Sequence, residues 1–256
     1  MAVVLDRAFV RASGPDAVAY LHSMVSNDVA AVPAGGGTYA LLLTPKARVI
    51  ADMEVFNTGS ELVLACPGDA RDVVIETLLR ARFRKKVDLE PVDRALVWGD
   101  ADGAMATLET PIGPHRLVAR AEDGDGLDAW ELARIEAGIP RFGREFGPDS
   151  MPAEAGLLER AVSFTKGCYP GQEPIARLHY RGHANRGLRG LRFGDAAGEA
   201  GASVAAGDRE VGRITSVALS PRFGSIGLAV LRREVADGDR VDAGGVAATV
   251  VSLPFG

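Results

Sequence analysis

The sequence predicts an α+β fold, in which a folded body over residues 1–190 precedes a small β-barrel over residues 191–256. In the first part, helical and strand patterns alternate without repeating as a regular strand–helix unit, which argues against a doubly wound sheet. After about Leu191, short strand-like runs alternate with Gly, Asp and Pro turns. Several short strands at this spacing are typical of a small all-β module.

The first predicted helix follows a run of start signals. Ser13 and Asp16 lie three residues apart before an apolar stretch, an arrangement that caps helix N-termini. Val18, Leu21 and Val25 then recur every three or four residues, so we expect them to form one buried face.

Two more helices are predicted in the body. Residues 69–84 have acids near the start and basic residues at the end, an order that suits the helix dipole. The residues expected on its buried face are Ala70, Val73, Val74, Thr77, Leu78 and Ala81. Residues 127–137 form the third helix, which Gly138 and Pro140 close.

Strands are predicted between these helices and throughout the barrel. They cover residues 39–43, 48–56, 61–66, 87–90, 94–98, 210–216, 225–231 and 246–253. Residues 122–126 are predicted to be a loop. The glycines at 35–37 lack the Lys and Ser/Thr of a phosphate-binding loop, so no nucleotide site is expected there.

Composition narrows the function classes. The net charge of −5 excludes a global positive field for nucleic acid, so no DNA partner is expected. No apolar run reaches the roughly 18–20 residues that a spanning helix needs, and the N-terminus does not resemble a signal peptide. Cys66 and Cys168 cannot by themselves build a four-ligand metal site, and no metal is expected. We expect two reduced thiols in a cytoplasmic protein, although one bridge between them stays open.

Cys168 lies in the most distinctive segment, Lys166–Glu173. Gly167 and Gly171 bracket the thiol and let the backbone turn tightly around it. The ammonium of Lys166 would favour the thiolate if it lay near the sulfur. The alternative is a small apolar cysteine packed like alanine, since cysteine is among the most buried residue types.

This segment resembles the signature of the YgfZ family, folate-binding proteins of iron–sulfur cluster maintenance. The Lys, Gly, Cys, Gly, Gln and Glu of the signature all match in order, with Tyr169 and Pro170 at its variable positions. The resemblance implies that Cys168 is the essential thiol and that Lys166 shapes its reactivity. The other signature residues are Gly167, Tyr169, Gly171, Gln172 and Glu173.

Further segments resemble the T-protein of the glycine cleavage system, to which the YgfZ family is related. They are residues 14–29, 45–48, 134–140, 151–157 and 211–255. Relatives often carry Gly at the position of Ala47. The resemblance covers nearly the whole chain and implies a ring-like folate-binding body with a central opening, followed by a small C-terminal β-barrel.

The same resemblance implies a folate site that includes Glu136. In T-protein-like proteins the matching glutamate of the Arg-Ile-Glu-Ala-Gly motif binds the pterin ring. A carboxylate can accept two parallel N–H bonds from an aminopyrimidine, and the helix dipole disfavours a glutamate near a helix C-terminus without such a role. Asn27 and Asp28, in the turn after the first helix, and Arg177 are the other expected folate-binding residues.

Two basic clusters stand out in this acidic chain. The first consists of Arg177, His179, Arg181, His183, Arg186, Arg189 and Arg192. It would suit an anion such as the glutamate tail of folate or an RNA phosphate, but it is also consistent with a solvated surface loop. The spacing of His179 and His183 would place them on one helix face, but the surrounding Arg and Gly residues argue against a helix there. The second cluster, within residues 82–86, is interpreted as a helix end that balances its dipole.

The leading hypothesis is a YgfZ-type protein that binds tetrahydrofolate or a one-carbon derivative. Its partners would be iron–sulfur enzymes or assembly factors, and any link to tRNA modification would be indirect. The enzyme alternative is an aminomethyltransferase that moves a one-carbon unit to tetrahydrofolate, with Asp28 or Asp52 as its acid/base residue. The third is a scaffold with a decayed folate pocket, for which Cys168 would be dispensable.

Overall fold

The computed structural model describes residues 2–122, 126–194 and 196–256, and it divides into two compact units. The N-terminal unit comprises the chain up to Leu127 together with Leu158–Arg177, and the barrel unit comprises Asp128–Leu157 and Leu178–Gly256. The predicted boundary near residue 190 stays a prediction. Residues 123–125 of the predicted loop lie outside the described part of the chain.

A five-stranded antiparallel sheet forms the centre of the N-terminal unit, with strand order β3-β4-β5-β2-β6. The strands are β2 (Ala8–Ser13), β3 (Gly37–Leu43), β4 (Val49–Asn57), β5 (Leu62–Cys66) and β6 (Asp88–Pro91). Four of them confirm predicted strands to within two residues at each end. Every residue of β5 is buried, which explains its unbroken apolar sequence.

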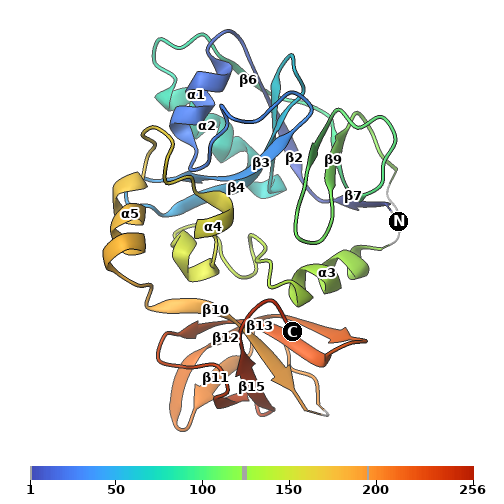
Figure 1. Cartoon of the computed structure of the whole chain (residues 1–256), viewed down its shortest axis with the longest axis vertical. Coiled ribbons are helices and arrows are strands. Elements are labelled where there is room, and N and C mark those ends of the chain that lie inside the picture. The colour runs from blue at the N-terminus through green and yellow to red at the C-terminus, as the bar shows by residue number, and fades with distance from the viewer. Residues whose placement is uncertain (1, 123–125, 195) are drawn as a thin grey trace. The chain divides into compact units, whose positions relative to one another are not determined.

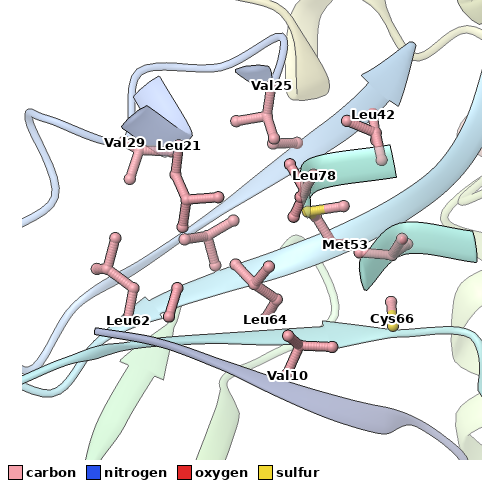
Figure 2. Packing of buried hydrophobic residues seen from close by; sticks show 14 of the residues in the cluster. Val10, Leu21, Val25, Val29, Leu42, Met53, Leu62, Leu64, Cys66 and Leu78 are labelled. Carbon is pink, nitrogen blue, oxygen red and sulfur yellow. The ribbon is translucent and has the colours of Figure 1, made fainter. Parts of the chain in front are cut away.

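Helices α1 (Ala17–Met24) and α2 (Arg71–Ala81) cover one face of this sheet, and a 3-10 turn, η1 (Gly68–Ala70), leads into α2. Figure 2 shows Leu21 and Leu78, from the two helices, pointing toward Met53 and Leu64 of the sheet. All four side chains are fully buried. Burying a leucine side chain contributes about 1.5–3 kcal/mol, so this cluster supplies much of the stability of the unit.

The predicted buried faces of these helices are wrong at three positions, Val18, Val73 and Ala81, all of which are exposed. Val18 and Val73 are each 42% exposed, whereas Tyr20 and Val74 are buried. In α1 the buried positions are Ala17, Tyr20 and Leu21, because the helix rests on the sheet along that i, i+3, i+4 line. Helix α2 also ends at Ala81 rather than at residue 84.

A second, four-stranded sheet has the order β1-β7-β9-β8. Its strands are β1 (Ala2–Leu5), β7 (Ala95–Gly99), β8 (Ala106–Leu108) and β9 (His115–Val118). Sequence analysis missed β8 and β9, because three- or four-residue strands carry too little periodicity to be recognised. A short helix, α4 (Leu158–Ala161), packs beside β3.

The barrel unit contains a closed six-stranded barrel, which confirms the predicted C-terminal module (Figure 1). Its strands are β10 (Arg186–Phe193), β11 (Ser203–Ala206), β12 (Arg209–Ser220), β13 (Gly224–Arg232), β14 (Arg240–Ala243) and β15 (Ala247–Val251). A fully buried cluster including Leu191, Ile214 and Val250 fills it. Closure pairs every strand edge, which removes the exposed edges that promote aggregation.

Two helical segments accompany the barrel strands, α3 (Leu127–Glu136) and the 3-10 turn η2 (Pro152–Ala155). Helix α3 ends where the sequence predicts. Gly138 adopts a left-handed φ of 67°, and a Cβ there would lie 2.7 Å from the Cβ of Leu253. Glycine is therefore required both by the backbone and by the close approach of the C-terminal segment.

Helix α5 (Gln172–Arg181) crosses the division between the two units. The expectation that the basic segment is not helical is wrong for Arg177, His179 and Arg181, which lie on this helix. It holds for His183, which follows the end of the helix. The two histidines therefore do not share a helical face.

Candidate functional site

Cys168 is a free, exposed thiol in the loop that precedes α5. The residues on either side of the loop are held in the protein, since Lys166 and Tyr169 are buried at 8% and 7% exposure. Burial raises the pKa of the Tyr169 phenol to about 12, so this ring stays neutral at any physiological pH. The sulfur of Cys168 is thus accessible to solvent, while the residues around it are held in place. Because the sulfur is exposed, it is not needed to fill space in the protein core.

Lys166 fixes the loop to the end of helix α1. Its Nζ donates hydrogen bonds to the carbonyl oxygens of His22 and Val25, the latter at 2.7 Å, and lies 4.9 Å from the centroid of the Tyr169 ring. The last carbonyls of a helix lack intrahelical partners and carry partial negative charge, so an ammonium is well placed there. The predicted role of Lys166 in tuning the thiol stays a prediction, since its Nζ contacts the end of α1 and the Tyr169 ring.

The buried ammonium of Lys166 should make the free energy of unfolding depend on pH. Burial lowers the pKa of Lys166 to about 8 from its ordinary value of 10.5, with the charge of Asp28 opposing the shift. The unfolded chain therefore binds a proton that the folded chain releases between these values, so the free energy of unfolding rises with pH across this window. We expect a rise of about 1 kcal/mol, because solvent screens part of the charge.

Urea titrations of wild type and Lys166→Met from pH 7.5 to 10.5 measure this effect. The variant should lack the rise, and the difference between the two curves should change steadily with pH. Curves that stay parallel across the window would contradict a buried, readily deprotonated Lys166.

Gly171 lets the loop approach the turn between β3 and β4. Its φ is 86°, and a Cβ there would lie 2.7 Å from the carbonyl oxygen of Thr44 and 3.0 Å from the Cα of Ala47. No other residue fits this position without moving backbone. Gly167 has no positive φ, and a Cβ on it would come no closer than 4.0 Å, to Nε2 of His22.

The predicted Asn27–Asp28 turn lies directly after the helix end that Lys166 contacts. Asn27 is half-buried, and its amide donates to the carbonyls of Tyr39 at 2.8 Å and Arg160 at 3.1 Å. Asp28 Oδ1 accepts the backbone N–H of Ala31 at 3.0 Å and lies 3.2 Å from Nδ1 of His22. The structure therefore brings the turn and the thiol segment together, and the folate-binding roles of Asn27 and Asp28 stay predictions.

Sequence analysis missed His22 at this place. Its Nδ1 faces Asp28 and its Nε2 faces Gly167, the residue before the thiol. A lone histidine on a helix gives no local signal, and only its position six residues before Asp28, near the helix end, could have pointed to it.

The remaining signature residues belong to helix α5. Gln172 is its first residue and is half-buried, while Glu173 is exposed. Glu173 Oε1 accepts a hydrogen bond from Arg177 at 3.4 Å, with side chains 85% and 75% exposed. A pair this exposed contributes little stability, and its guanidinium can be recruited by an anion at small cost.

Strand β4 carries buried carboxylates on the face opposite Met53. Asp52 accepts two hydrogen bonds from Arg7, each 3.0 Å, and one from the Tyr39 hydroxyl at 3.0 Å. Glu54 Oε1 lies 2.7 Å from Nδ1 of buried His115. Carboxylates at alternating positions of a strand usually indicate a face exposed to solvent. Here both carboxylates are buried against side chains that are distant in sequence, which the sequence alone does not reveal.

Glu136 lies at the end of α3 in the barrel unit and is half-buried. Its Oε1 accepts a hydrogen bond from the Ser220 hydroxyl at 2.6 Å, and its backbone carbonyl accepts the N–H of Phe255 at 2.9 Å. One helical turn earlier, Leu132 lines a hollow of about 390 Å³ between α3 and β12. The other lining residues are Asp128, Ala129, Glu131, Val217, Ala218 and Leu219.

Behind Glu136, a buried polar network ties α3 to the barrel. The Arg134 guanidinium donates to Glu145 at 3.2 Å and to Ser216 at 2.7 Å, and Ser216 donates to Glu145 at 2.5 Å. The side chains of Arg134 and Glu145 are 1% and 0% exposed. The network fixes the helix end that presents Glu136.

Within the described ranges, no group of three or more His, Cys, Asp or Glu side chains is arranged to hold a metal ion. In the same part of the chain, every helix is too short or too polar to cross a bilayer.

Comparison with known proteins supports the relationship that these segments suggest. The model of the glycine cleavage T-protein C-terminal barrel domain matches residues 186–255. The aminomethyltransferase of Cutibacterium acnes is 31% identical to this chain, over 96% of this chain and 84% of that protein. The chain belongs to the glycine cleavage T-protein-like family.

Other members of this family carry different names. The human mitochondrial iron-sulfur cluster assembly factor IBA57 is 28% identical, over 97% of this chain and 82% of its own length. The tRNA-modifying protein YgfZ of Pectobacterium atrosepticum is 27% identical, over 79% and 72%, which confirms the predicted resemblance. The crystal structure of aminomethyltransferase T from Bartonella henselae superposes with a TM-score of 0.81 at 19% identity, covering 100% of this chain and 86% of that one. This similarity confirms the predicted fold.

Proposed function

We propose that this protein binds tetrahydrofolate or a one-carbon derivative and supports the assembly or repair of iron–sulfur enzymes, with Cys168 as its working thiol. The observation that carries the proposal is the exposed sulfur of Cys168 on a loop held by buried Lys166 and Tyr169. Relatives named as an iron–sulfur cluster assembly factor and as a tRNA-modifying protein support the same role. The partners would be iron–sulfur enzymes or their assembly factors, and an effect on tRNA would follow from those enzymes.

The loop geometry favours a chemical role over packing. A cysteine that merely fills space is buried, as Cys66 is at 0% exposure. Cys168 instead meets solvent, while the elements around it are fixed by Gly171 against the β3–β4 turn and by Lys166 against α1. A fixed, accessible thiol is suited to contact a partner protein, an iron–sulfur centre or an oxidised sulfur.

Glu136 is proposed to hold the pterin ring. Ser220 fixes one oxygen of its carboxylate, which orients the group for a bidentate contact with an aminopyrimidine. The adjacent hollow, lined by Leu132 and Leu219, offers apolar surface to a ring system. On the N-terminal unit, Asn27, Asp28 and Arg177 stay proposed folate contacts, and the Asn27 side chain also hydrogen-bonds three backbone groups.

Glu136→Ala is expected to weaken tetrahydrofolate binding by about 10- to 100-fold, because a hydrogen bond to a charged group contributes about 1.5–3 kcal/mol. Isothermal titration calorimetry under reducing, anaerobic conditions measures this loss. Glu210→Ala is the matched control, since it removes an exposed carboxylate from the same barrel unit. The binding role fails if tetrahydrofolate gives no heat with wild type, or if both variants bind equally well.

The second candidate is an aminomethyltransferase, which the 31% identity to the Cutibacterium acnes protein favours. Its acid/base residue would be Asp52 or Asp28. Asp52 is 2% exposed, and Arg7 and Tyr39 hydrogen-bond to its two oxygens, so a substrate would have to displace these partners to reach it. Methylene-tetrahydrofolate formed from an aminomethylated carrier protein would establish this activity, and its absence would leave the maintenance role.

A further inference from the structure

Phe83 is an exposed aromatic side chain held in an unusual backbone conformation. It follows α2 by two residues, is 87% exposed and has a φ of 48°. A bulky residue with a left-handed φ is strained, and such strain tends to persist where it has a function. Neither the folate site nor the thiol loop uses this residue.

The turn that carries Phe83 is firmly held. The backbone N–H of Lys86 donates to Asp16 Oδ2 at 2.7 Å, and the Lys86 carbonyl accepts the N–H of Asp16 at 3.2 Å. The Arg82 guanidinium donates to the carbonyl of Val87 at 3.0 Å. A Cβ on Gly14 would lie 2.5 Å from the carbonyl oxygen of Lys86, so the two turns are in close contact. These contacts fix the backbone of the turn, so the Phe83 side chain projects into solvent from a rigid position.

Three cationic residues directly follow Phe83 in the chain. Arg84, Lys85 and Lys86 are exposed, and the Arg84 guanidinium lies 5.4 Å from the centroid of the Phe83 ring. These residues line a hollow of about 360 Å³ together with Gly14 and Pro15. The cluster is locally positive in a chain with a net charge of −5. Balancing the helix dipole explains the basic residues but not the exposed, strained Phe83 among them.

Helix α2 also exposes an apolar side chain near its C-terminal end. Leu79, four residues before Phe83, is 41% exposed and lines a second hollow of about 570 Å³ with Ile75. The carboxylates of Asp72 and Glu76 border that hollow, and Asp88 borders the first one. We call the residues Leu79, Phe83, Arg84, Lys85 and Lys86 the Phe83 patch.

We propose that the Phe83 patch docks a partner protein whose contact surface is acidic and contains an apolar pocket for the phenyl ring. Aromatic and arginine side chains anchor many binding hot spots, and the cations would steer an acidic partner toward this ring. A single-stranded nucleic acid fits less well, because one aromatic cannot stack successive bases. This surface is independent of the folate and thiol chemistry proposed above.

The test places a photo-crosslinking phenylalanine analogue at position 83 in the full chain, in cells of the source organism. Val18, an exposed apolar residue of α1, is the matched control position. We expect an adduct from position 83 and none from position 18. The captured protein, once purified, should be acidic and should bind wild type at least ten-fold more tightly than Phe83→Ser or Lys85→Glu, with affinity falling as salt rises. No adduct, or an affinity that neither variant changes, would overturn the proposal.

Stability separates this role from a structural one. Phe83→Gly should not lower the midpoint of thermal unfolding, because glycine adopts the left-handed conformation without strain, yet it should lose partner binding as Phe83→Ser does. A large drop in the midpoint would show that the ring supports the fold and would overturn the proposal. Vesicles of phosphatidylglycerol, single-stranded RNA and sedimentation of the chain alone are run alongside. If the vesicles or the RNA bind in a Phe83-dependent way, or if the chain dimerises through Phe83, the patch binds that ligand or a second copy and the partner-protein proposal is overturned.

Discussion

Cys168→Ala is expected to abolish the recovery of iron–sulfur-dependent tRNA thiolation in a strain that lacks its own YgfZ-type gene, whereas the wild-type chain restores it. The change removes one exposed sulfur and little packing, since Lys166 and Gly171 hold the loop through other contacts. The activity of an iron–sulfur tRNA-thiolating enzyme, compared at matched protein levels, measures the effect. The melting temperature of the variant should equal that of wild type.

Thiol counting supplies the control for this result. A thiol-specific reagent should titrate one cysteine in the native wild type, none in native Cys168→Ala and two in the unfolded wild type. Cys66 stays silent in the native chain because it is fully buried, and burial raises the pKa of its thiol to about 11. Complementation by Cys168→Ala at wild-type level would support the scaffold hypothesis. Failure of the wild type itself would refute the maintenance role and leave the aminomethyltransferase assay to decide.

Arg134→Met is expected to lower the free energy of unfolding of the barrel unit by about 3–5 kcal/mol, the usual loss when one partner of a buried ion pair is removed. Among the described residues, the substitution leaves the carboxylate of Glu145, at 0% exposure, with Ser216 and the backbone N–H of Arg141 as its hydrogen-bond donors. Arg134→Met/Glu145→Gln should recover part of this loss, because the second change removes the unpaired charge.

Guanidinium chloride titrations measure the loss through the fluorescence of Trp130 in α3, in a Trp98→Phe background. The chain has only these two tryptophans, so the signal then reports the barrel unit. Arg177→Ala is the control, because its partner Glu173 is 85% exposed and the pair adds little stability. An Arg134→Met transition that coincides with the control would show that the network contributes nothing, and Glu136 would then need another support.

The sequence by itself determined the features that depend on neighbouring residues. The barrel follows from short apolar runs separated by Gly, Asp and Pro turns, and six strands do close there. The end of α3 follows from Gly138, whose left-handed backbone stops the helix. The thiol segment is also local, because its eight residues are contiguous and carry their own glycines. In each case the physical cause lies within one or two turns of chain.

Only the tertiary structure decided which distant groups meet. Lys166 reaches carbonyls 144 and 141 residues away, and Arg7 pairs with Asp52 across 45 residues. Val18 and Tyr20 have similar helical surroundings, yet the sheet buries Tyr20 alone. The periodicity of apolar residues shows that a helix has an apolar side, but which of its residues are buried depends on where the sheet contacts the helix. For the same reason the exposure of Phe83 and the position of His22 beside Gly167 could not be predicted: each is a property of how separate elements pack, which local sequence does not encode.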